Sequence, residues 1–365
     1  MRFIYKNTFI SESKLQYNRI EAGAKILFDK ISQLNIEDLP ISDYNKRYFG
    51  NIKRELRSEL QKYGYLLGLS TQNIENLNNA VFIDYGGGHG TFALLARAIG
   101  IGMVIHNDIY DVSCKDAEII AKAIGLKADH YVPGNIDDLV DYLKQEKMNV
   151  DIISSYDVIE HIYDITDYIS KLPAIPSRNL KFVFGSGANM YNPLLNYLLK
   201  KNHKIAEKQN RERVKGSKER DTYRSYIEVR KEIIKNNFID ISDDKLDYLS
   251  VATRGLIEED IVKYVKQYMK SGVFEYKPDH PTNTCDPLTG NWLEHLMSKD
   301  FLIETFKKSN YKVKITSGFH KSYNNPIVRF IGGFINLFIS ATKQKNLLFS
   351  PYYIVSSESI VETKS

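Results

Sequence analysis

Apolar positions along the chain alternate between short continuous runs and helical spacing. Residues 80–83 (AVFI) form a run typical of a strand buried on both faces. Residues 91–99 then carry apolar side chains at the spacing of a helix that ends near Gly100. Further apolar runs predict four more strands, at 103–106, 130–132, 150–156 and 180–185. Strands that alternate with helices in this way indicate an α/β fold with a parallel sheet.

The C-terminal part of the chain continues this pattern. A helix is predicted at 292–306, and strands are predicted at 311–315 and 350–357. Between these strands lies the apolar segment 327–340, which is too short to span a membrane and contains Arg329. We expect a buried helix there, and a helix lying in a membrane interface is the alternative.

The regions outside this core have a mostly helical pattern. In the first 79 residues, one amphipathic helix is predicted at 48–67, where apolar residues recur about every fourth position. The stretch 200–237 is basic and helical in pattern, which is typical of a solvated face but can also bind an anionic partner. The turn-rich stretch 279–290 (DHPTNTCDPLTG) is the candidate substrate loop. The predicted regions are a helical cap at 1–79, a core at 80–190, a helical and loop insertion at 191–293, and a C-terminal completion of the core at 294–358.

The composition is that of an ordinary globular protein. Hydrophobic residues make up 43% of the 365 positions, and the net charge of +5 does not require a nucleic acid as partner. The two cysteines, Cys114 and Cys285, provide no disulfide framework and favour a reducing, cytoplasmic compartment. The first residues, MRFIYKNTFISESK, lack the continuous apolar region of a secretory signal.

A glycine-rich turn follows the first predicted strand. It reads Asp84-x-Gly86-x-Gly88-x-Gly90, whereas the dinucleotide fingerprint G-x-G-x-x-G has its last glycine one place later, where Thr91 stands. Glycine permits backbone angles closed to other residues and lets a ligand lie against bare main chain. A helix that starts at this turn points its first N–H groups at the ligand. The carboxylate before the first glycine suits a ligand that carries a positively charged amino group.

This stretch resembles motif I of the class I methyltransferases that use S-adenosylmethionine (SAM). Further along the chain, Asp157-Val158-Ile159-Glu160-His161 resembles motif IV of the subgroup with a V-x-E-H signature. Two motifs in this order imply a Rossmann-like fold with a seven-stranded, mostly parallel sheet whose last strand is antiparallel. They also imply SAM as the cofactor.

The resemblance implies particular contacts to that cofactor. Asp108 would accept the ribose hydroxyls, and Asp111 is either an alternative acceptor or a helix cap. Asn135 would accept the adenine amine through its carbonyl oxygen, the N–H of Ile136 would meet a ring nitrogen, and Asp137 is a substitute for Asn135. The remaining expected contacts are Asp84, Gly86, Gly88, Gly90, Ile109, Ser155 and Tyr156.

Methyl transfer from a sulfonium requires an aligned nucleophile and a base that removes its proton. Histidine suits a hydroxyl acceptor because its pKa lies near neutrality. The candidates are His161, which could instead cap or pack against its own helix, His280 and His295. His280, Cys285 and Asp286 could converge, but no pair has the spacing of a zinc or iron site, so no metal is predicted.

These patterns favour a SAM-dependent methyltransferase. The expected reaction is O-methylation of a small molecule, a sugar or a lipid-linked glycan, with N-methylation as the next choice. Two other classes stay open: a nucleic-acid or protein methyltransferase that grips its substrate with the basic stretch at 200–235, and a non-catalytic SAM-binding protein. We expect a small-molecule or glycan partner rather than nucleic acid, with peripheral membrane contact through 327–340 or the basic stretch. Nothing in the sequence sets the oligomeric state.

Overall fold

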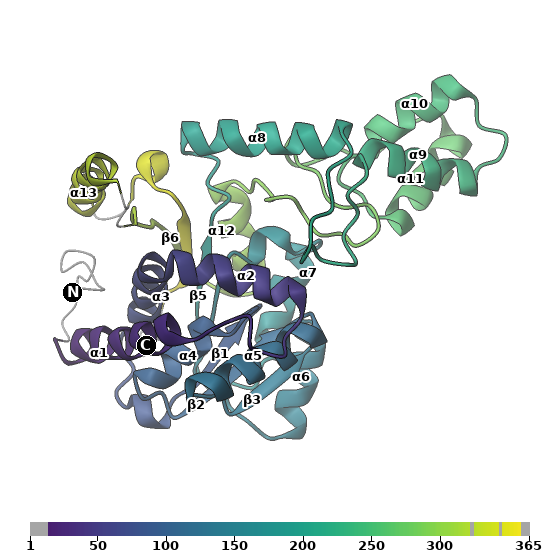
Figure 1. Ribbon diagram of the computed structural model, residues 1–365. Helices are drawn as coiled ribbons and strands as arrows, with labels where there is room; N and C mark the ends of the chain where they lie inside the picture. Colours follow the sequence, from purple (N-terminus) through teal and green to yellow (C-terminus); the bar gives the residue numbers. More distant parts are fainter. Residues whose placement is uncertain (1–13, 322–324, 343–344, 359–365) are drawn as a thin grey trace, which may run out of the picture. The chain divides into compact units, whose positions relative to one another are not determined.

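The computed structural model describes residues 14–321, 325–342 and 345–358 and contains two compact units (Figure 1). The first, here called the sheet unit, comprises the described residues up to 159, residues 166–186 and the described residues from 299 onward. The second, here called the insertion unit, comprises residues 160–165 and 187–298. The insertion therefore leaves the sheet unit after residue 186 and returns to it at residue 299.

Seven strands of the described chain form one sheet. Its strands are β1 (Val81–Tyr85), β2 (Met103–Asp108), β3 (His130–Pro133), β4 (Ile152–Tyr156), β5 (Lys181–Ser186), β6 (Val313–Ser317) and β7 (Tyr353–Ser357). Their order is β3-β2-β1-β4-β5-β7-β6. Strands β1 to β5 pair in parallel, whereas β7 lies antiparallel to both β5 and β6. This arrangement confirms the predicted Rossmann-like fold with an antiparallel last strand.

The centre of the sheet is apolar on both faces because helices cover it on both sides. Phe82 and Ile83 of β1 and Phe182 and Phe184 of β5 are fully buried. Strand β1 lies between β2 and β4. The strands that follow β1 in the chain are added first on one side of it, as β2 and β3, and then on the other side, from β4 onward. In open α/β sheets, ligands bind at such a switch point, beyond the carboxyl ends of the strands. The glycine-rich turn follows β1 at this place.

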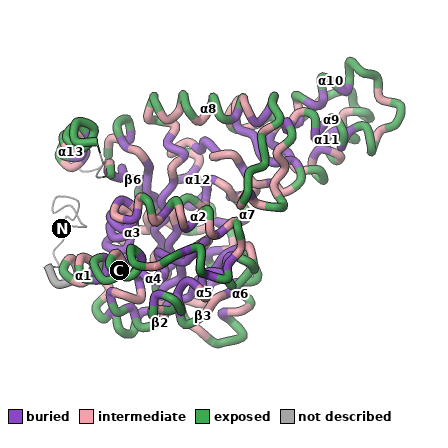
Figure 2. Tube along the Cα trace, in the orientation of Figure 1, coloured by how far each residue is buried: buried purple, intermediate pink, exposed green. Residues whose placement is uncertain are grey.

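Helices surround the sheet in the order in which the sequence alternates. They are α1 (Lys14–Gln33), α2 (Asp43–Arg54), α3 (Leu56–Thr71), α4 (Thr91–Ala98), α5 (Asp111–Ile124), α6 (Ile136–Gln145), α7 (Ile165–Lys171), α12 (Lys299–Lys308) and α13 (Pro326–Ala341). Short 3-10 turns lie at Leu77–Asn79, Ile159–His161, Leu172–Ala174 and Leu347–Phe349. Helix α1 packs on α3 and α4, and α3 packs on β4 and β5. Buried positions accordingly concentrate in the strands and the inner helix faces (Figure 2).

Two predicted helices are corrected by the structure. The single helix expected at 48–67 is two helices, α2 and α3, because Glu55 leaves helical geometry at φ −109° and ψ 18°. The helix expected at 292–306 begins only at Lys299. Trp292 instead forms an isolated bridge with Cys285. The apolar side chains of this segment are thus buried although its backbone is irregular. Hydrophobic periodicity alone does not distinguish such a segment from a helix.

The insertion unit contains four helices among its described residues: α8 (Pro193–Lys208), α9 (Tyr226–Asn237), α10 (Asp243–Ala252) and α11 (Glu258–Ser271). The stretch 200–237 is therefore not one helix, because residues 209–225 have no regular structure between α8 and α9. Helices α9, α10 and α11 share a small apolar core that includes Ile234, Leu249 and Ile261. The turn-rich stretch 279–290 is irregular, as predicted.

The apolar segment 327–340 forms α13, and the expectation that it is buried is wrong. Only Gly332, Asn336 and Ile339 of this helix are buried, and most of its apolar side chains face outward (Figure 2). Within the described chain, none of the helices has the length and apolar character needed to cross a bilayer. The feature that overturns the expectation is a second apolar stripe on the outer face of the helix.

Candidate functional site

The glycine turn between β1 and α4 adopts the backbone that its three alternating glycines permit. Gly86, Gly88 and Gly90 have φ angles of +66°, +52° and +78°, in the left-handed region that L side chains rarely adopt. A Cβ at Gly86 would also lie 2.6 Å from a methyl of Val158, the residue of the second motif that follows Asp157. The turn therefore presents bare main chain at the carboxyl end of β1.

Asp84 faces inward from β1 and binds the protein itself. Its Oδ2 accepts the N–H of Ala93 at 2.9 Å, in the first turn of α4, and lies 3.8 Å from Nδ1 of His106. Burial lowers the pKa of His106, but the Asp84 carboxylate and Cys114 outweigh it, so that this pKa is raised overall. In this structure Asp84 is buried, and its carboxylate supports the start of α4.

Asp108 closes the same turn from the end of β2. Its Oδ2 accepts the N–H of Gly88 at 2.9 Å, and its Oδ1 accepts the N–H of Tyr110 at 2.9 Å. Both oxygens of the carboxylate therefore bind backbone N–H groups around the turn. Asp111 lies in the first turn of α5 and pairs with Lys115, one helical turn further on. Of the two carboxylates, Asp108 is the one attached to the glycine turn.

The side chain of Asn135, the next predicted cofactor contact, caps the start of α6. Its Oδ1 accepts the N–H groups of Asp137 and Asp138, at 2.7 and 3.2 Å, and Asp138 accepts the N–H of Asn135 in return. This capping box takes up the carbonyl oxygen that was expected to accept an adenine amine. The substitute, Asp137, pairs with Lys171 at 2.7 Å. The Asn135-x-x-Asp138 spacing was a sequence signal for this cap.

Other groups at this edge of the sheet could contact the adenine ring of a cofactor. Ile136 begins α6, and the first N–H groups of a helix have no intrahelical acceptor. Ile109 follows Asp108 directly, and its apolar side chain is exposed. At the end of β4, the buried Ser155 hydroxyl finds no hydrogen-bond partner among the described residues. These three residues could contact a ligand without breaking an existing interaction.

Helix α2 covers the glycine turn with aromatic side chains that the sequence did not identify. The ring of Tyr48 lies 5.0 Å from the ring of His89 and would be 3.0 Å from a Cβ at Gly88. Tyr44 stacks on Tyr48 and approaches the Tyr110 ring at 6.3 Å. Burial raises the pKa of Tyr48 well above its usual value, and the negative charge of Asp157 adds to this effect. The N-terminal helices thus form part of the wall around this turn.

His89 is held neutral inside the turn. Its Nδ1 accepts the N–H of Thr91 at 3.2 Å and lies 2.7 Å from the Thr91 hydroxyl. Burial, together with the nearby His106 and Lys62, lowers the pKa of His89 to about 3. A neutral imidazole with a bare Nδ1 caps the start of α4. His89 is therefore a structural member of the turn.

A pocket of about 230 Å³ lies in the sheet unit at the carboxyl end of β4. Residues of α3, Tyr156, the segment 319–321 after β6, and Pro351 and Tyr352 before β7 line it. The Lys62 ammonium lies 3.8 Å from the centre of the Tyr156 ring and 2.6 Å from a Glu59 oxygen. The pocket thus has an aromatic wall and paired charges, which suits a polar organic molecule. Tyr156, one of the predicted cofactor contacts, belongs to this pocket.

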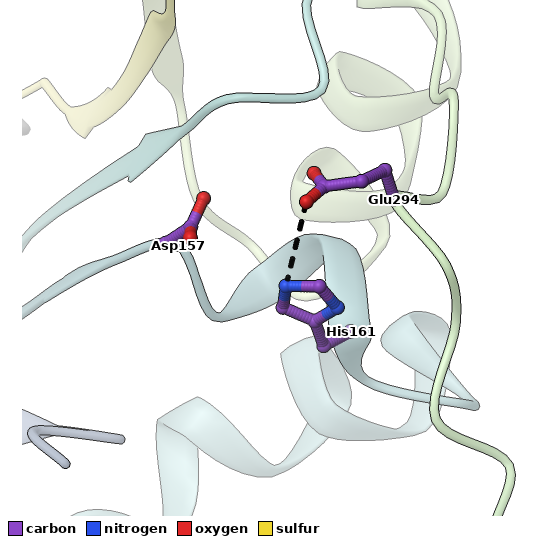
Figure 3. Close-up of side chains that lie close together, drawn as sticks. All are labelled: Asp157, His161 and Glu294. Carbon is purple, nitrogen blue, oxygen red and sulfur yellow. Dashed lines mark ion pairs between the residues drawn. The ribbon is translucent and has the colours of Figure 1, made fainter. Parts of the chain in front are cut away.

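His161 lies in the insertion unit, at the end of the 3-10 turn that follows β4. Its Nδ1 is 2.8 Å from the carbonyl oxygen of Trp292, and its Nε2 is 3.9 Å from Oε1 of Glu294 (Figure 3). The Trp292 carbonyl can only accept, so Nδ1 carries a proton and the neutral ring has its lone pair on Nε2. Glu294 has a φ of +60°, which is uncommon outside glycine. The geometry orients Nε2 as a proton acceptor beside a carboxylate.

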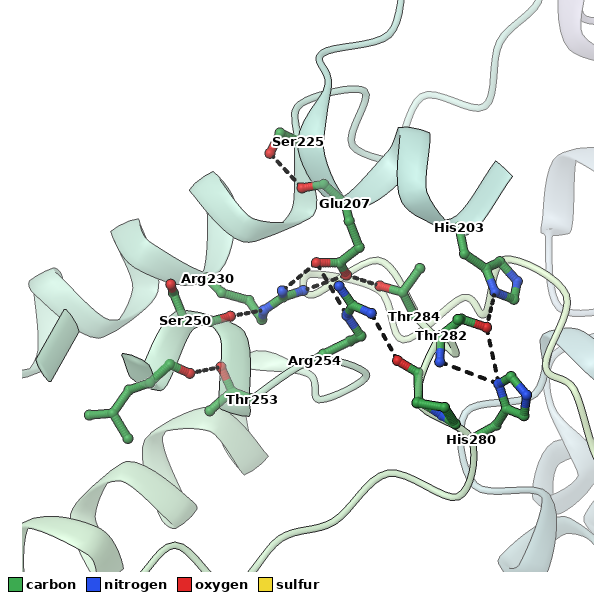
Figure 4. Close-up of polar contacts among 12 residues, drawn as sticks. His203, Glu207, Ser225, Arg230, Ser250, Thr253, Arg254, His280, Thr282 and Thr284 are labelled. Atoms are coloured by element: carbon green, nitrogen blue, oxygen red, sulfur yellow. Dashed lines mark hydrogen bonds and ion pairs between the residues drawn. The ribbon is translucent and has the colours of Figure 1, made fainter. Parts of the chain in front are cut away.

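The other two candidate histidines have different surroundings within the insertion unit. His295 is buried, stacks on the Trp292 ring at 4.2 Å and lies 3.4 Å from Oδ2 of Asp279. His280 Nδ1 lies 3.0 Å from the hydroxyl of Thr282 (Figure 4). Burial lowers the pKa of His280, and the positive charge of Lys200 adds to this effect. Of the three, His161 combines a half-buried ring with an Nδ1 that donates to a backbone carbonyl.

The basic stretch of the insertion unit contains a buried ion pair. Arg230 and Glu207 are both buried and form two hydrogen bonds, at 2.7 and 3.1 Å (Figure 4). The Arg254 Nε adds a contact to Glu207 at 3.5 Å, and Thr284 donates to the same carboxylate. Arg213 donates to backbone carbonyls of the loop between α8 and α9. Part of this basic stretch is therefore used to hold the unit together.

Cys285 and Asp286 were considered as metal ligands together with His280. Cys285 is buried, and that burial raises the pKa of its thiol, which disfavours the thiolate that binds metals. Asp286 accepts the N–H groups of Thr222 and Leu288, at 2.5 and 2.9 Å. Asp286 thus stabilises the loop at 279–290, and the prediction of no metal remains a prediction.

Comparisons with known proteins return distant structural likenesses. No family model matches the chain, and no curated protein matches its sequence. A candidate SAM-dependent methyltransferase from Streptococcus mutans aligns over 36% of this chain and 35% of its own, at 16% identity and a TM-score of 0.29. This chain therefore spans about a third of the length of that protein.

Two other structures align over more of the chain. A SAM-dependent methyltransferase from Archaeoglobus fulgidus covers 86% of this chain and 94% of its own, at 15% identity and a TM-score of 0.33. A complex of the Haloferax volcanii Trm112 methyltransferase activator with a candidate methyltransferase covers 87% and 97%, at 10% identity and a TM-score of 0.41. Likenesses this distant do not assign an activity to the chain.

Proposed function

We propose that this chain is a SAM-dependent methyltransferase. The observation that carries the proposal is the turn after β1, where Gly86, Gly88 and Gly90 all adopt positive φ and Asp108 from β2 closes the loop. This turn lies at the switch point of a seven-stranded sheet whose strand order and antiparallel last strand fit a class I methyltransferase. A nucleoside ligand with an amino acid end suits this edge of the sheet.

The residues present fit such a cofactor. Bare main chain at Gly86 and Gly88 accommodates the amino acid end, and the carboxylate of Asp108 accepts the ribose hydroxyls. Ile109 offers an exposed apolar surface to the adenine ring, and the N–H of Ile136, which the Asn135 cap does not bind, suits a ring nitrogen. The unpartnered Ser155 hydroxyl adds one further polar contact. Asp84 and Asn135 act indirectly, because they hold the helix starts around the cofactor.

The pocket at the carboxyl end of β4 is the proposed acceptor pocket. It combines the rings of Tyr65, Tyr156 and Tyr352 with Lys62 and Glu59. Aromatic faces together with hydrogen-bonding charged groups are typical of sites that bind sugars and hydroxylated rings. This composition favours a hydroxyl acceptor of a small molecule or glycan, and hence O-methylation.

His161 is the proposed base. SAM, when bound, supplies a methyl group that is already activated by the sulfonium. The remaining task is to take a proton from the acceptor hydroxyl, and the bare Nε2 of His161 suits it. Glu294 would then stabilise the imidazolium through its carboxylate. His161 is the last residue of the stretch that resembles motif IV, four residues after Asp157 in the chain.

The nucleic-acid alternative has less support. A protein that grips phosphates needs lysines and arginines with ends turned to the solvent. Arg230 is fully buried against Glu207, Arg224 pairs with Glu232, and Arg213 binds loop carbonyls. These contacts engage arginines of the stretch that would have to bind the phosphates.

Calorimetry with S-adenosylhomocysteine tests the cofactor assignment, and transfer of a radiolabelled methyl group from SAM to a panel of sugars, phenols and glycolipids tests the reaction. We expect wild-type protein to bind the nucleoside and to label a hydroxylated acceptor. His161→Gln should bind it with unchanged affinity and lose the transfer, whereas the control His130→Gln, at the amino end of β3, should retain both. Absence of nucleoside binding would overturn the proposal, and binding without transfer to any acceptor would support the non-catalytic class.

A further inference from the structure

Helix α13 presents an apolar face to the outside of the sheet unit. Ile327, Phe330 and Phe334 expose 69%, 78% and 69% of their surface. With Ile331, Leu337 and Phe338, which are also exposed, they follow the i, i+3, i+4, i+7 spacing of one helix face. The Phe349 ring contacts the Phe338 ring, with 5.6 Å between centroids, and extends the surface. These exposed side chains, together with Leu348, are here called the α13 patch.

The opposite face of α13 is fixed to the sheet unit. Asn336 accepts the N–H of His320 at 2.7 Å and donates to the His320 carbonyl at 2.9 Å. Ile339 joins the main apolar core, and Ile335 packs against it. The helix therefore has its own buried stripe, and the α13 patch is additional to what the fold requires. A large exposed apolar patch of this kind marks an interaction surface.

The stretch of sequence that contains α13 has charged side chains of a single sign. Residues 305–357 contain no aspartate or glutamate, although the whole chain has 45 acidic residues. The same stretch contains eight basic residues: Lys307, Lys308, Lys312, Lys314, Lys321, Arg329, Lys343 and Lys345. Lys321 pairs with Glu55 and Lys312 pairs with Glu358, so the positive excess is reduced at these two residues but not removed. An apolar helix within a basic, acid-free stretch of chain complements an apolar layer covered by anionic groups.

We propose that the α13 patch inserts into the interfacial layer of an anionic lipid bilayer and holds the protein on that surface. The helix of 16 residues is about 24 Å long, and its face suits an orientation parallel to the membrane. The four exposed phenylalanine and isoleucine positions at its start supply the apolar contact, and the basic residues attract anionic headgroups. This inference does not depend on methyl transfer.

A second copy of the chain is a poorer occupant of the α13 patch. A symmetric dimer through this face would bring together two copies of the stretch 305–357, which is basic and has no carboxylate side chain of its own. Repulsion between like charges opposes that contact, whereas an anionic bilayer neutralises both the charge and the apolar surface. The lipid surface is therefore the occupant that the charge pattern favours.

The test is flotation of the full-length protein with vesicles of phosphatidylcholine that contain about 30 mol% phosphatidylglycerol. The wild type should float with these vesicles and not with pure phosphatidylcholine, and added salt should weaken binding. Phe330→Ser/Phe334→Ser should lower the vesicle partition coefficient about a hundredfold. The matched control Ile239→Ser/Val273→Ser removes two side chains of 90% and 60% exposure from the insertion unit and should bind as the wild type does.

A fluorescence measurement keeps the test independent of the serine variant. Phe334→Trp should show a blue shift of its emission on addition of the anionic vesicles, and the wild type, whose only tryptophan is Trp292, provides the baseline. Calorimetry with S-adenosylhomocysteine should give the same affinity for Phe330→Ser/Phe334→Ser as for the wild type, so loss of vesicle binding is distinguishable from failure of the cofactor assignment. Three outcomes would overturn the inference: no flotation of the wild type, equal flotation of the serine variant, or a wild-type dimer in light scattering that Phe330→Ser/Phe334→Ser dissociates.

Discussion

The carboxylate of Asp108 accepts the N–H of Gly88 at 2.9 Å and so joins the end of β2 to the glycine turn after β1. The same carboxylate is the proposed ribose acceptor. Replacement by alanine removes charge-assisted hydrogen bonds to the ligand, and we expect Asp108→Ala to weaken SAM binding by about 1.5–3 kcal/mol. Calorimetric titration measures this change directly.

Asp111→Ala provides the matched control for Asp108. Its carboxylate lies three residues further on and pairs with Lys115 on the surface of α5. SAM affinity should stay within about 0.5 kcal/mol of the wild type, because surface pairs of this kind contribute little. Equal losses in the two variants would argue against the ribose role of Asp108.

Gly86 is expected to tolerate no side chain. At its φ of +66° an alanine is strained, and its Cβ would lie 2.6 Å from Val158. We expect Gly86→Ala to lower the free energy of unfolding by about 2–4 kcal/mol, as measured by urea denaturation. Addition of Val158→Ala should recover the part that comes from the clash.

Gly50→Ala is the control for this substitution. Gly50 lies within α2, and a Cβ there would meet nothing within 4 Å. Alanine should therefore leave the stability unchanged or raise it by up to about 1 kcal/mol. If Gly86→Ala behaved in the same way, the strained turn described above would be wrong.

The free energy of unfolding should decrease as the pH falls, and His89 should account for part of that decrease. The folded protein keeps this residue neutral with a pKa of about 3, whereas the unfolded chain protonates it near its ordinary value of 6.5. Between these values the unfolded state binds more protons, so the contribution of His89 is complete above pH 6.5 and is lost as the pH falls toward 3. From pH 6.5 to 4.5 we expect His89 to account for about 2 kcal/mol of lost stability.

Urea denaturation at several pH values tests this assignment. His89→Asn keeps an oxygen that can accept the Thr91 N–H but cannot titrate, so its stability should depend less steeply on pH than that of the wild type. The relevant quantity is the difference between the two proteins, because other groups titrate in both. Parallel curves over this range would exclude His89 as the source.

The ion pair between Glu207 and Arg230 should be important for folding of the insertion unit. Both side chains are buried, so Glu207→Gln would leave an unneutralised guanidinium inside the unit. We expect a loss of about 3–5 kcal/mol in the free energy of unfolding. The exposed pair between Arg224 and Glu232 is the control, and Glu232→Gln should cost less than about 1 kcal/mol. Similar losses at both positions would contradict a structural role for Glu207.

The strands and the glycine turn were predictable because local signals determine them. Apolar runs locate β1 to β5 within a few residues, and the alternating glycines match three positive φ angles. The break at Glu55 was not predictable, since no proline or glycine stands there and the apolar spacing continues through it. Helix α3, which begins after this break, packs on β4 and β5, and such tertiary contacts are not encoded in a local pattern.

The surroundings of the candidate site were less accessible from the sequence. Tyr48 contacts His89 across 41 positions of the chain, and no local pattern encodes such a contact. The cap formed by Asn135 could have been recognised from Asp138 three residues later. The exposure of α13 could not, because both of its faces are apolar and only tertiary contacts decide which of them is covered.

The position of β7 between β5 and β6 has a consequence for biosynthesis. During translation β5 and β6 leave the ribosome well before Tyr353–Ser357, the segment that hydrogen-bonds to both of them. Until then the edge of β5 is an open template for intermolecular pairing, and β6 has no partner in the sheet. A premature stop upstream of β7 would thus produce an aggregation-prone nascent product in which β1 to β5 can already be paired.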